Sequence, residues 1–398
     1  MTETATETAD ILILGAGMAG ASVGYALAGR GVSVLLLERE DQPGYHSTGR
    51  SAALFSETYG PPLVRRLSAA SRAFLDAPPD GFTEVPLLTP RGLLAMGLPG
   101  QDEAIDALVD EACAGGGPGT MEHLDAAALL EAVPILRPGV FTSGALEPGA
   151  RDMDVDALHT GFLKGLRRMG GRVLAGAEAA ALSHAGGVWR VATRGGAVCE
   201  APVVVNAAGA WADEVAGLAG VRPLGLTPKR RTALLVDAPA GASVAGWPMT
   251  GDLDDTVYFK PDAGRLLLSP ADATPVPPQD VQPELEDVAV AVDRFQRITT
   301  HTVERPRATW AGLRSFVPDG VPVAGFAPEP DAGGASGFFW LAGQGGYGIQ
   351  TAVGLARAAA ALALGEALPD DVAAKGVTAA ALAPERPTLS VPNPEAPR

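Results

Sequence analysis

Three glycines near the start of the chain have the spacing of a dinucleotide-binding loop. Gly15, Gly17 and Gly20 form G-x-G-x-x-G between an apolar run and a helix pattern. In such a loop the first glycine makes a tight turn, the second lets the backbone approach a pyrophosphate, and the third packs helix against strand. Glu38 follows about 20 residues later, where its carboxylate can accept hydrogen bonds from an adenosine ribose, and Arg39 comes next. We expect an ADP-containing dinucleotide, NAD or FAD, rather than a glycine turn kept for packing alone.

Two further segments favour FAD over NAD. Residues 45–53, Y-H-S-T-G-R-S-A-A, are small and polar, so they can wrap a long ligand, although an ordinary surface loop has the same composition. Residues 343–348, G-Q-G-G-Y-G, join an apolar strand to an alanine-rich helix that we expect to begin near Ile349. Backbone N–H groups at a helix start stabilise negative charge. A reduced flavin carries its negative charge on the pyrimidine ring, so this helix start favours hydride acceptance.

Two arginines in apolar surroundings are candidates for binding a small carboxylate. Arg231 follows P-K-R, and Arg314 lies in T-W-A-G-L-R-S-F-V-P-D-G. A guanidinium pairs bidentately with a carboxylate and keeps its charge. Tyr59 and Tyr258 can add hydroxyl hydrogen bonds. The alternatives are buried structural ion pairs for the arginines and half-buried aromatic packing for the tyrosines.

Composition and missing motifs exclude several other functions. The net charge of −16 argues against nucleic acid as a partner, because binding it requires Lys and Arg to neutralise phosphates. With no P-loop or G-x-S-x-G motif, we expect neither phosphoryl transfer nor hydrolysis. The histidines have no metal-ligand spacing, so we expect no metal site; they are His46, His123, His159, His184 and His301.

The same sequence indicates a cytoplasmic protein without a membrane span. Cys113 and Cys199 are too few for a disulfide framework, which favours a reducing compartment. The first nine residues lack the basic and apolar regions of an export signal. The most apolar helix pattern, 352–364, carries Arg357 and is shorter than the roughly 20 residues of a bilayer span.

These residues need an α/β fold to bring them together. The runs 11–14 and 32–37 read as parallel strands around a helix at 18–30, and 203–205 and 338–342 read as further buried strands of the same sheet. We expect 11–14, 203–205 and 338–342 to be sheet neighbours.

A second domain is expected from the change of pattern between these strands. Residues 101–113 and 284–300 read as exposed helices, and 256–260 and 265–269 read as a hairpin. We also expect a loop at 114–119 and a proline-rich tail after about 384. The predicted fold is α/β, with a Rossmann-like FAD-binding domain and a discontinuous α+β substrate domain built on an antiparallel sheet. The FAD-binding domain takes residues 1–85, 151–216 and 311–398, and the substrate domain takes 86–150 and 217–310.

Several stretches together resemble a known family. They are H-S-T-G-R-S-A-A from His46, P-L-L-T-P-R from Pro86, V-N-A-A-G-A-W from Val205, P-K-R-R from Pro228, Y-F-K-P-D-A-G from Tyr258, W-A-G-L-R-S-F-V from Trp310 and Q-G-G-Y-G-I-Q from Gln344. The chain resembles the D-amino-acid oxidase-like FAD-dependent oxidoreductases over nearly its whole length and, within them, is most similar to the bacterial FAD-dependent D-arginine dehydrogenases.

The resemblance implies roles for individual residues. Arg231 and Arg314 would hold a substrate carboxylate, Tyr59 would lie on a mobile lid, Tyr258 would border the carboxylate, and the Gly346 carbonyl would meet the amine. Leu54, Leu93 and Gln350 would line the substrate pocket. The cofactor contacts would be Gly15, Gly17, Ala19, Gly20, Glu38, Arg39, Ser47, Thr48, Arg50, Ser51, Ala52, Ala53, Ala208, Gly209, Trp211, Gly345, Gly346, Tyr347, Gly348, Ile349 and Gln350. Because Ala52 offers no side chain for a bond to the flavin, FAD is expected to be noncovalent.

Two departures from the D-arginine dehydrogenases bear on the substrate. Leu93 stands where those enzymes have a glutamate for the guanidinium, and Leu54 stands where they have a histidine. A desolvated guanidinium without a carboxylate partner is costly. The resemblance therefore implies oxidative deamination of a hydrophobic D-amino acid to an imino acid and then a 2-oxo acid, by hydride transfer to flavin N5. Alternatives are oxidation of a secondary amine, an N-methyl amino acid or a biosynthetic amine, and a non-catalytic flavin-binding protein. The electron acceptor is left open.

Overall fold

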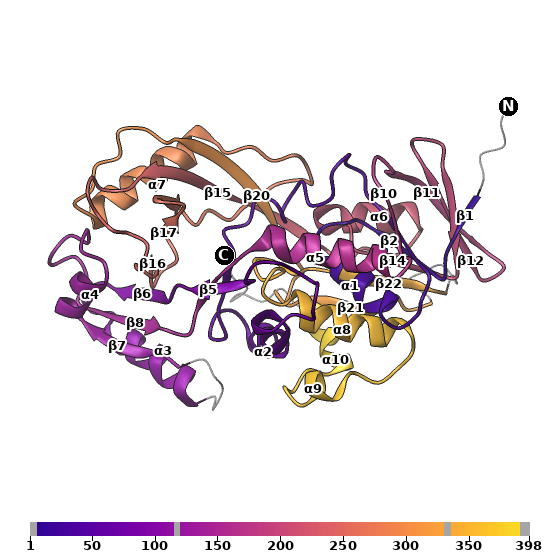
Figure 1. The fold of residues 1–398 in the computed structure, drawn as a ribbon, viewed down its shortest axis with the longest axis horizontal. Coiled ribbons are helices and arrows are strands. Elements are labelled where there is room, and N and C mark those ends of the chain that lie inside the picture. Colours follow the sequence, from indigo (N-terminus) through magenta and orange to yellow (C-terminus); the bar gives the residue numbers. More distant parts are fainter. Residues whose placement is uncertain (1–5, 115–119, 330–335, 391–398) are drawn as a thin grey trace.

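The computed structural model describes residues 6–114, 120–329 and 336–390. Two main sheets lie side by side along the long axis of the molecule (Figure 1). The first sheet has the strand order β10 (Arg172–Leu174), β3 (Val34–Leu37), β2 (Ile11–Leu14), β14 (Val203–Asn206), β22 (Phe338–Ala342) and β21 (Val323–Phe326). Its neighbouring strands are parallel except β21 and β22. The expected adjacency of 11–14, 203–205 and 338–342 is confirmed, since β14 pairs with both β2 and β22.

The parallel strands end at one edge of this sheet, which positions the predicted cofactor residues. β2 runs into Gly15, β3 into Glu38, β14 into Ala207 and β22 into Gly343. In open α/β sheets ligands bind outside these carboxyl ends. Four segments that are distant in the sequence therefore meet at one place.

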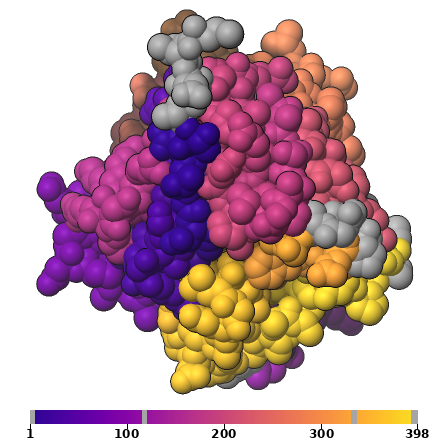
Figure 2. Space-filling view, turned by 90° about the vertical axis from the view of Figure 1, so that its right-hand side faces the viewer, coloured from indigo at the N-terminus to yellow at the C-terminus, as the bar shows by residue number. Residues whose placement is uncertain are grey.

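Successive side chains of these strands pack into separate cores because they point to opposite faces of the sheet. On one face Ile13 and Leu36 pack with α1 (Met18–Ala28), α2 (Pro62–Asp76), α5 (Val155–Arg168) and α8 (Ala352–Ala363). On the other face Leu12 and Leu35 pack with Trp189 of a smaller sheet. That sheet consists of β1 (Thr6–Thr8), β13 (Val198–Ala201), β12 (Val188–Thr193) and β11 (Ala179–Ala185). Figure 2 shows N-terminal, central and C-terminal segments side by side at this end of the molecule.

The second main sheet is mostly antiparallel. Its order is β19 (Thr274–Pro275), β15 (Thr227–Asp237), β18 (Arg265–Ser269), β17 (Tyr258–Asp262), β16 (Met249–Asp252), β6 (Leu93–Gly97), β8 (Ser143–Glu147) and β7 (Glu122–Asp125), and β20 (Ala308–Phe316) pairs with β15. Within this sheet, β16 and β6 are the only described pair that runs parallel. Ala263 and Gly264, with φ of 47° and 80°, close the β17–β18 hairpin as a tight turn requires. The helices of this part are α3 (Asp102–Ala114), α4 (Ala126–Ala132) and α7 (Leu285–Ile298).

A short sheet of β4 (Leu54–Phe55), β9 (Arg151–Met153) and β5 (Leu88–Pro90) carries the chain between the two parts. The remaining elements are η1 (Gly209–Trp211), α6 (Ala212–Leu218), α9 (Asp370–Ala373), α10 (Ala379–Leu382) and η2 (Pro387–Ser390). No helix in the described ranges is both long and apolar enough to cross a bilayer.

Two expectations about local structure need correction. The helix expected near Ile349 begins at Ala352, because 348–351 form a turn in which Thr351 N–H donates to the Tyr347 carbonyl. The segment after 384 is not a loose tail up to Ser390, because the buried Arg386 is ion-paired to Asp319 at 2.6 Å. The loop expected at 114–119 lies, apart from Ala114 at the end of α3, outside the described residues. The division into two domains stays a proposal, and β20 crosses its boundary at 311.

Candidate active site

A cavity of about 900 Å³ connects the edge of the parallel sheet with the inner face of the second sheet. The predicted catalytic residues, Tyr59, Arg231, Tyr258, Arg314 and Gly346, all line it. Leu54, Leu93 and Gln350 line it as well. Of the predicted cofactor contacts only Gly20 stands back from the cavity wall. The fold therefore gathers residues from 15 to 350 around one ligand-sized space.

The glycine turn has no room for side chains. Gly15 has a φ of 101°, and a Cβ there would lie 2.5 Å from the Ala207 carbonyl oxygen. A Cβ at Gly20 would lie 1.8 Å from the Gly15 carbonyl oxygen, so Gly20 lets α1 pack on the turn. Glu38 accepts from the Ala16 N–H at 2.9 Å and lines the cavity. Bare backbone beside this carboxylate fits the ADP half of FAD.

His159, a buried residue of α5, supports this turn. Its Nε2 donates to the Ala16 carbonyl oxygen at 2.8 Å, and because a carbonyl only accepts, Nε2 carries the proton. Burial lowers the pKa of His159, although the Ala16 carbonyl and the charge of Asp156 oppose this shift. The sequence offered no signal for this role, because the contact joins residues on separate elements.

We expect His159→Gln to change how stability depends on pH. Below about pH 6.5, the ordinary histidine pKa, the unfolded chain binds a proton at His159 that the folded chain binds only at lower pH. The free energy of unfolding therefore falls as the pH drops from about 6.5 toward the lowered folded pKa. Glutamine keeps an N–H for the Ala16 carbonyl and does not titrate. The fall in the free energy of unfolding that comes from His159 should therefore be absent in the variant. Denaturant unfolding between about pH 5 and 7 measures it, and identical slopes for wild type and variant would contradict the assignment.

The predicted cofactor residues Arg39 and Arg50 have protein partners of their own. Arg39 stacks on Trp211 at 4.8 Å from the ring centroid. Arg50 donates to the Val281 and Ala311 carbonyl oxygens and pairs with Asp280. Arg50 therefore anchors this segment beside the cavity, and its guanidinium already has protein partners.

The two predicted carboxylate-binding arginines lie on neighbouring strands of the second sheet. In the β15–β20 register, Arg231 is opposite Gly312 and Arg314 is opposite Lys229, so both arginines project from the same face. Arg231 donates to the Asp272 carbonyl at 2.8 Å and lies 5.9 Å from the ring of Tyr258. Arg314 donates to the Tyr59 hydroxyl at 3.3 Å.

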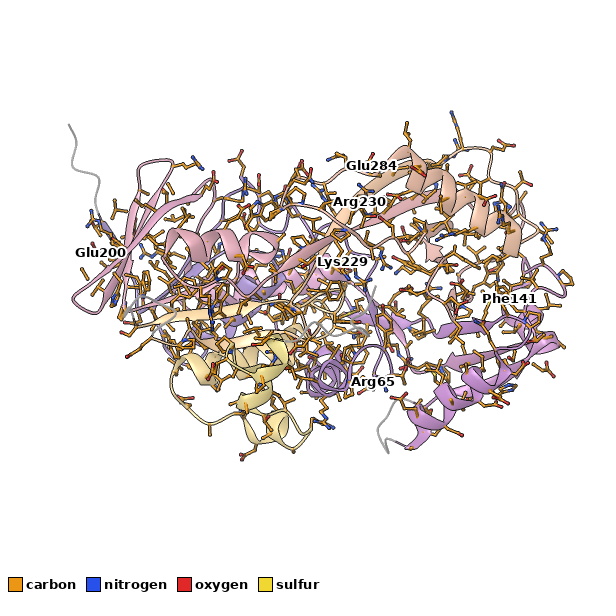
Figure 3. All side chains as sticks on the ribbon, turned by 180° about the vertical axis from the view of Figure 1, so that it is seen from behind. Arg65, Phe141, Glu200, Lys229, Arg230 and Glu284 are labelled. Carbon is orange, nitrogen blue, oxygen red and sulfur yellow. The ribbon has the colours of Figure 1, made fainter. Side chains whose placement is uncertain are left out.

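Strand alternation separates Arg231 from its neighbour Arg230. Arg230 pairs with Glu284 at 3.0 Å and with Asp287 at 2.8 Å, on the side of the sheet where α7 lies (Figure 3). Arg230 thus forms structural ion pairs, whereas its neighbour Arg231 lines the cavity.

Three buried donors around the cavity have no partner in the described chain. They are Arg314 Nη1, Gln344 Nε2 and Gln350 Nε2. The Arg314 guanidinium packs so closely on Gly346 that a Cβ there would lie 1.6 Å from Nη2. Buried donors need acceptors, so this end of the cavity fits a ligand rich in oxygen or nitrogen acceptors, which a flavin ring and a carboxylate both are.

Sequence reasoning missed Asp255, on the turn between β16 and β17. Its φ of 50° is unusual for a residue with a side chain. Its Oδ2 lies 3.9 Å from Arg231 Nη2, and it lines the cavity. Burial raises the pKa of Asp255, while the charges of Arg231 and Arg314 lower it. The run D-L-D-D at 252–255 reads as an ordinary polar turn, so only the fold reveals this position.

Some N–H groups at the start of α8, which was expected to favour negative charge, already donate to protein acceptors. The Ala352 N–H donates to the Ile349 carbonyl, and the Gly354 N–H donates to Ser71 Oγ. The glycine-rich turn that precedes the helix lines the cavity.

Comparison with known proteins agrees with this geometry. A family model described as FAD dependent oxidoreductase matches residues 10–362. Glycerol-3-phosphate dehydrogenase 1 of Mycobacterium tuberculosis is 27% identical over 351 residues, which cover 82% of this chain and 64% of that protein, so the chain spans less than two thirds of this relative. Glycine oxidase from Geobacillus kaustophilus shares the fold with a TM-score of 0.78 and 22% identity, covering 91% of this chain and 96% of its own. Iminodiacetate oxidase from Chelativorans sp. BNC1 does so with a TM-score of 0.76 and 20% identity, covering 94% and 98%.

Proposed function

The chain belongs to the family of FAD-dependent oxidoreductases, and from this premise we propose that it oxidises the carbon–nitrogen bond of an amino acid. The observation that carries the proposal is Arg314, whose buried Nη1 has no partner in the described chain while Arg231 shares its sheet face. A carboxylate satisfies such a guanidinium with two parallel hydrogen bonds. In finer terms we propose a D-amino acid with an apolar side chain, as the resemblance to D-arginine dehydrogenases and the two leucines Leu54 and Leu93 imply. That closer resemblance, and the noncovalent FAD expected from Ala52, stay predictions.

The residues around the cavity have separate roles in binding and orienting the amino acid. Arg231 and Arg314 hold the carboxylate, Tyr59 and Tyr258 border it, and the Gly346 carbonyl accepts from the amine, which together fix the orientation of Cα. Oxidation breaks the Cα–H bond and removes a proton from nitrogen, which leaves a C=N bond that water hydrolyses to a 2-oxo acid. FAD supplies the hydride acceptor when bound.

The charges of the site support a zwitterion over a phosphate ester. Asp255 lies beside the arginine pair, 3.9 Å from Arg231. The negative charge of Asp255 attracts the ammonium group of an amino acid and repels a phosphate dianion. Glycerol-3-phosphate, the substrate in the name of the curated relative, is therefore the weaker candidate.

Oxidation of a secondary amine is the alternative within the same chemistry, and one of the solved structures is named an iminodiacetate oxidase. Turnover with an artificial electron acceptor separates the candidates. We expect D-leucine to be oxidised faster than sarcosine, L-leucine or glycerol-3-phosphate at equal concentration. A preference for sarcosine would favour the alternative, and turnover of glycerol-3-phosphate alone would refute amino-acid oxidation.

The wild type is expected to prefer D-leucine over D-arginine by about one to two orders of magnitude in kcat/KM, because burying an apolar side chain is worth roughly 1.5–3 kcal/mol. Leu93 lies in the cavity, so Leu93→Glu should shift the preference toward D-arginine. Leu93→Gln is the matched control, since it has the same size without the charge.

Glu57 is paired with Arg72 and Glu84 is exposed, whereas Asp252, Asp254 and Asp255 of the β16–β17 segment line the cavity and are the acids to consider for a guanidinium. Equal turnover of D-leucine and D-arginine by the wild type would indicate that these aspartates bind the guanidinium of D-arginine.

A further inference from the structure

The loop at 56–60 borders the cavity, and its first three residues are polar yet buried. Ser56 and Thr58 are 1% and 6% exposed, and both line the cavity together with Tyr59. The loop leads from β4 into α2 and carries Tyr59 to its contact with Arg314. Polar groups in such a place need fixed partners.

Those partners come from one residue of the other sheet. Glu147 ends β8 and is 1% exposed. Its Oε2 accepts from Ser56 Oγ and from Thr58 Oγ1, each at 2.6 Å, and its Oε1 accepts from the Glu57 N–H at 3.1 Å. A single carboxylate thus holds three consecutive residues of the loop.

Ser56 passes this constraint to Tyr59. Its hydroxyl proton goes to Glu147, so its oxygen lone pairs are free to accept from the Tyr59 N–H at 3.1 Å and the Thr58 N–H at 3.3 Å. The Ser56 N–H donates to Gln350 Oε1 at 3.2 Å, which orients the unpartnered Gln350 Nε2. Tyr59 in turn packs on Tyr347, with ring centroids 5.3 Å apart.

We propose that Glu147 is a positioning residue for substrate binding, which acts through Ser56 to place the Tyr59 hydroxyl beside Arg314. The proposal rests on the proposed function, because it treats Arg314 as the carboxylate-binding residue. Glutamine at 147 keeps the volume of the side chain but has a single acceptor oxygen, so either the two hydroxyls or the Glu57 N–H loses its partner. Either loss loosens the loop segment that fixes the backbone of Tyr59.

A double-mutant cycle tests whether Glu147 acts through Tyr59. The probe is 4-methylpentanoate, which is leucine without its amine, and its Kd is measured on the FAD-loaded protein from the change in flavin absorbance. Glu147→Gln is expected to raise Kd about tenfold in wild type and less than about twofold in Tyr59→Phe, since contacting residues couple and independent ones add. An equal rise in both backgrounds, or none in wild type, overturns the proposal.

Two hydroxyl variants keep the test decisive if Glu147→Gln folds poorly. Ser56→Ala removes the link to Tyr59, whereas Thr58→Val removes one hydrogen bond to Glu147 and leaves that link. We expect the larger rise in Kd for Ser56→Ala at similar Tm, and the reverse order would overturn the proposal. If 4-methylpentanoate fails to bind the wild type at all, carboxylate recognition fails, and with it the proposed function rather than the role of Glu147 alone.

Discussion

Replacing Arg314 by methionine should lower kcat/KM for an amino-acid substrate by about three orders of magnitude while FAD stays bound. Removing one partner of a buried charge pair costs about 3–5 kcal/mol, and each 1.36 kcal/mol is a tenfold change in rate. Methionine retains much of the side-chain length, so the packing against Gly346 and Tyr59 is changed less than by alanine. Steady-state kinetics give the effect on KM and kcat, and the flavin absorbance of the purified variant reports cofactor content.

Arg230→Met is the matched control for this result. Arg230 pairs with Glu284 and Asp287 away from the cavity, so its loss should lower Tm but leave kcat/KM within about twofold. If Arg314→Met kept wild-type kcat/KM, Arg314 would be a structural residue and the carboxylate site would lie elsewhere.

Gly20→Ala should abolish FAD binding or the fold itself. A Cβ at Gly20 would lie 1.8 Å from the Gly15 carbonyl oxygen, and backbone cannot move aside as a flexible side chain can. The turn at Gly15 and the helix α1 would separate, and the cavity edge beside Glu38 would lose its shape. The ratio of flavin to protein after purification measures the outcome, and we expect it to fall at least about tenfold, since a backbone overlap of this kind costs several kcal/mol.

Gly29→Ala is the control within the same helix region. Gly29 ends α1 at a φ of −62°, is exposed, and would place a Cβ 3.4 Å from its nearest neighbour. We expect normal flavin content from it. Full flavin content in Gly20→Ala would show that the close approach of helix and turn is not required.

The sequence predicted those parts of the molecule whose signals are local. Strand 11–14, Gly15 and Glu38 lie within one βαβ unit, and the motif itself carries their spacing. The sheet neighbours at 203–206 and 338–342 were recognisable because each is a short apolar run that ends at small residues. The start of α8 was misplaced because Gly348 and the residues after it form a turn whose hydrogen bonds helix propensity does not reveal.

The other residues of the site depend on contacts between distant segments. Glu147 reaches Ser56 across 91 positions, and His159 reaches Ala16 across 143. A single acidic or imidazole residue carries no signal of its partner at such separations. The position of Asp255 depends on the left-handed backbone of its turn. In the sequence, its polar neighbours look like those of any surface turn. Arg231 and Arg314 were candidates from their residue type and apolar surroundings, the resemblance implied their role, and the strand register then showed that they share one face.

The central claim, that this FAD-dependent oxidoreductase acts on an amino acid, is tested most directly by anaerobic reduction of its flavin. The purified protein is mixed without oxygen with single D- and L-amino acids, sarcosine and glycerol-3-phosphate, and the absorbance of the oxidised flavin is followed. We predict that apolar D-amino acids such as D-leucine and D-methionine bleach the flavin, and that Arg314→Met loses this response. Bleaching by glycerol-3-phosphate, with none of the amino acids effective, would contradict the account.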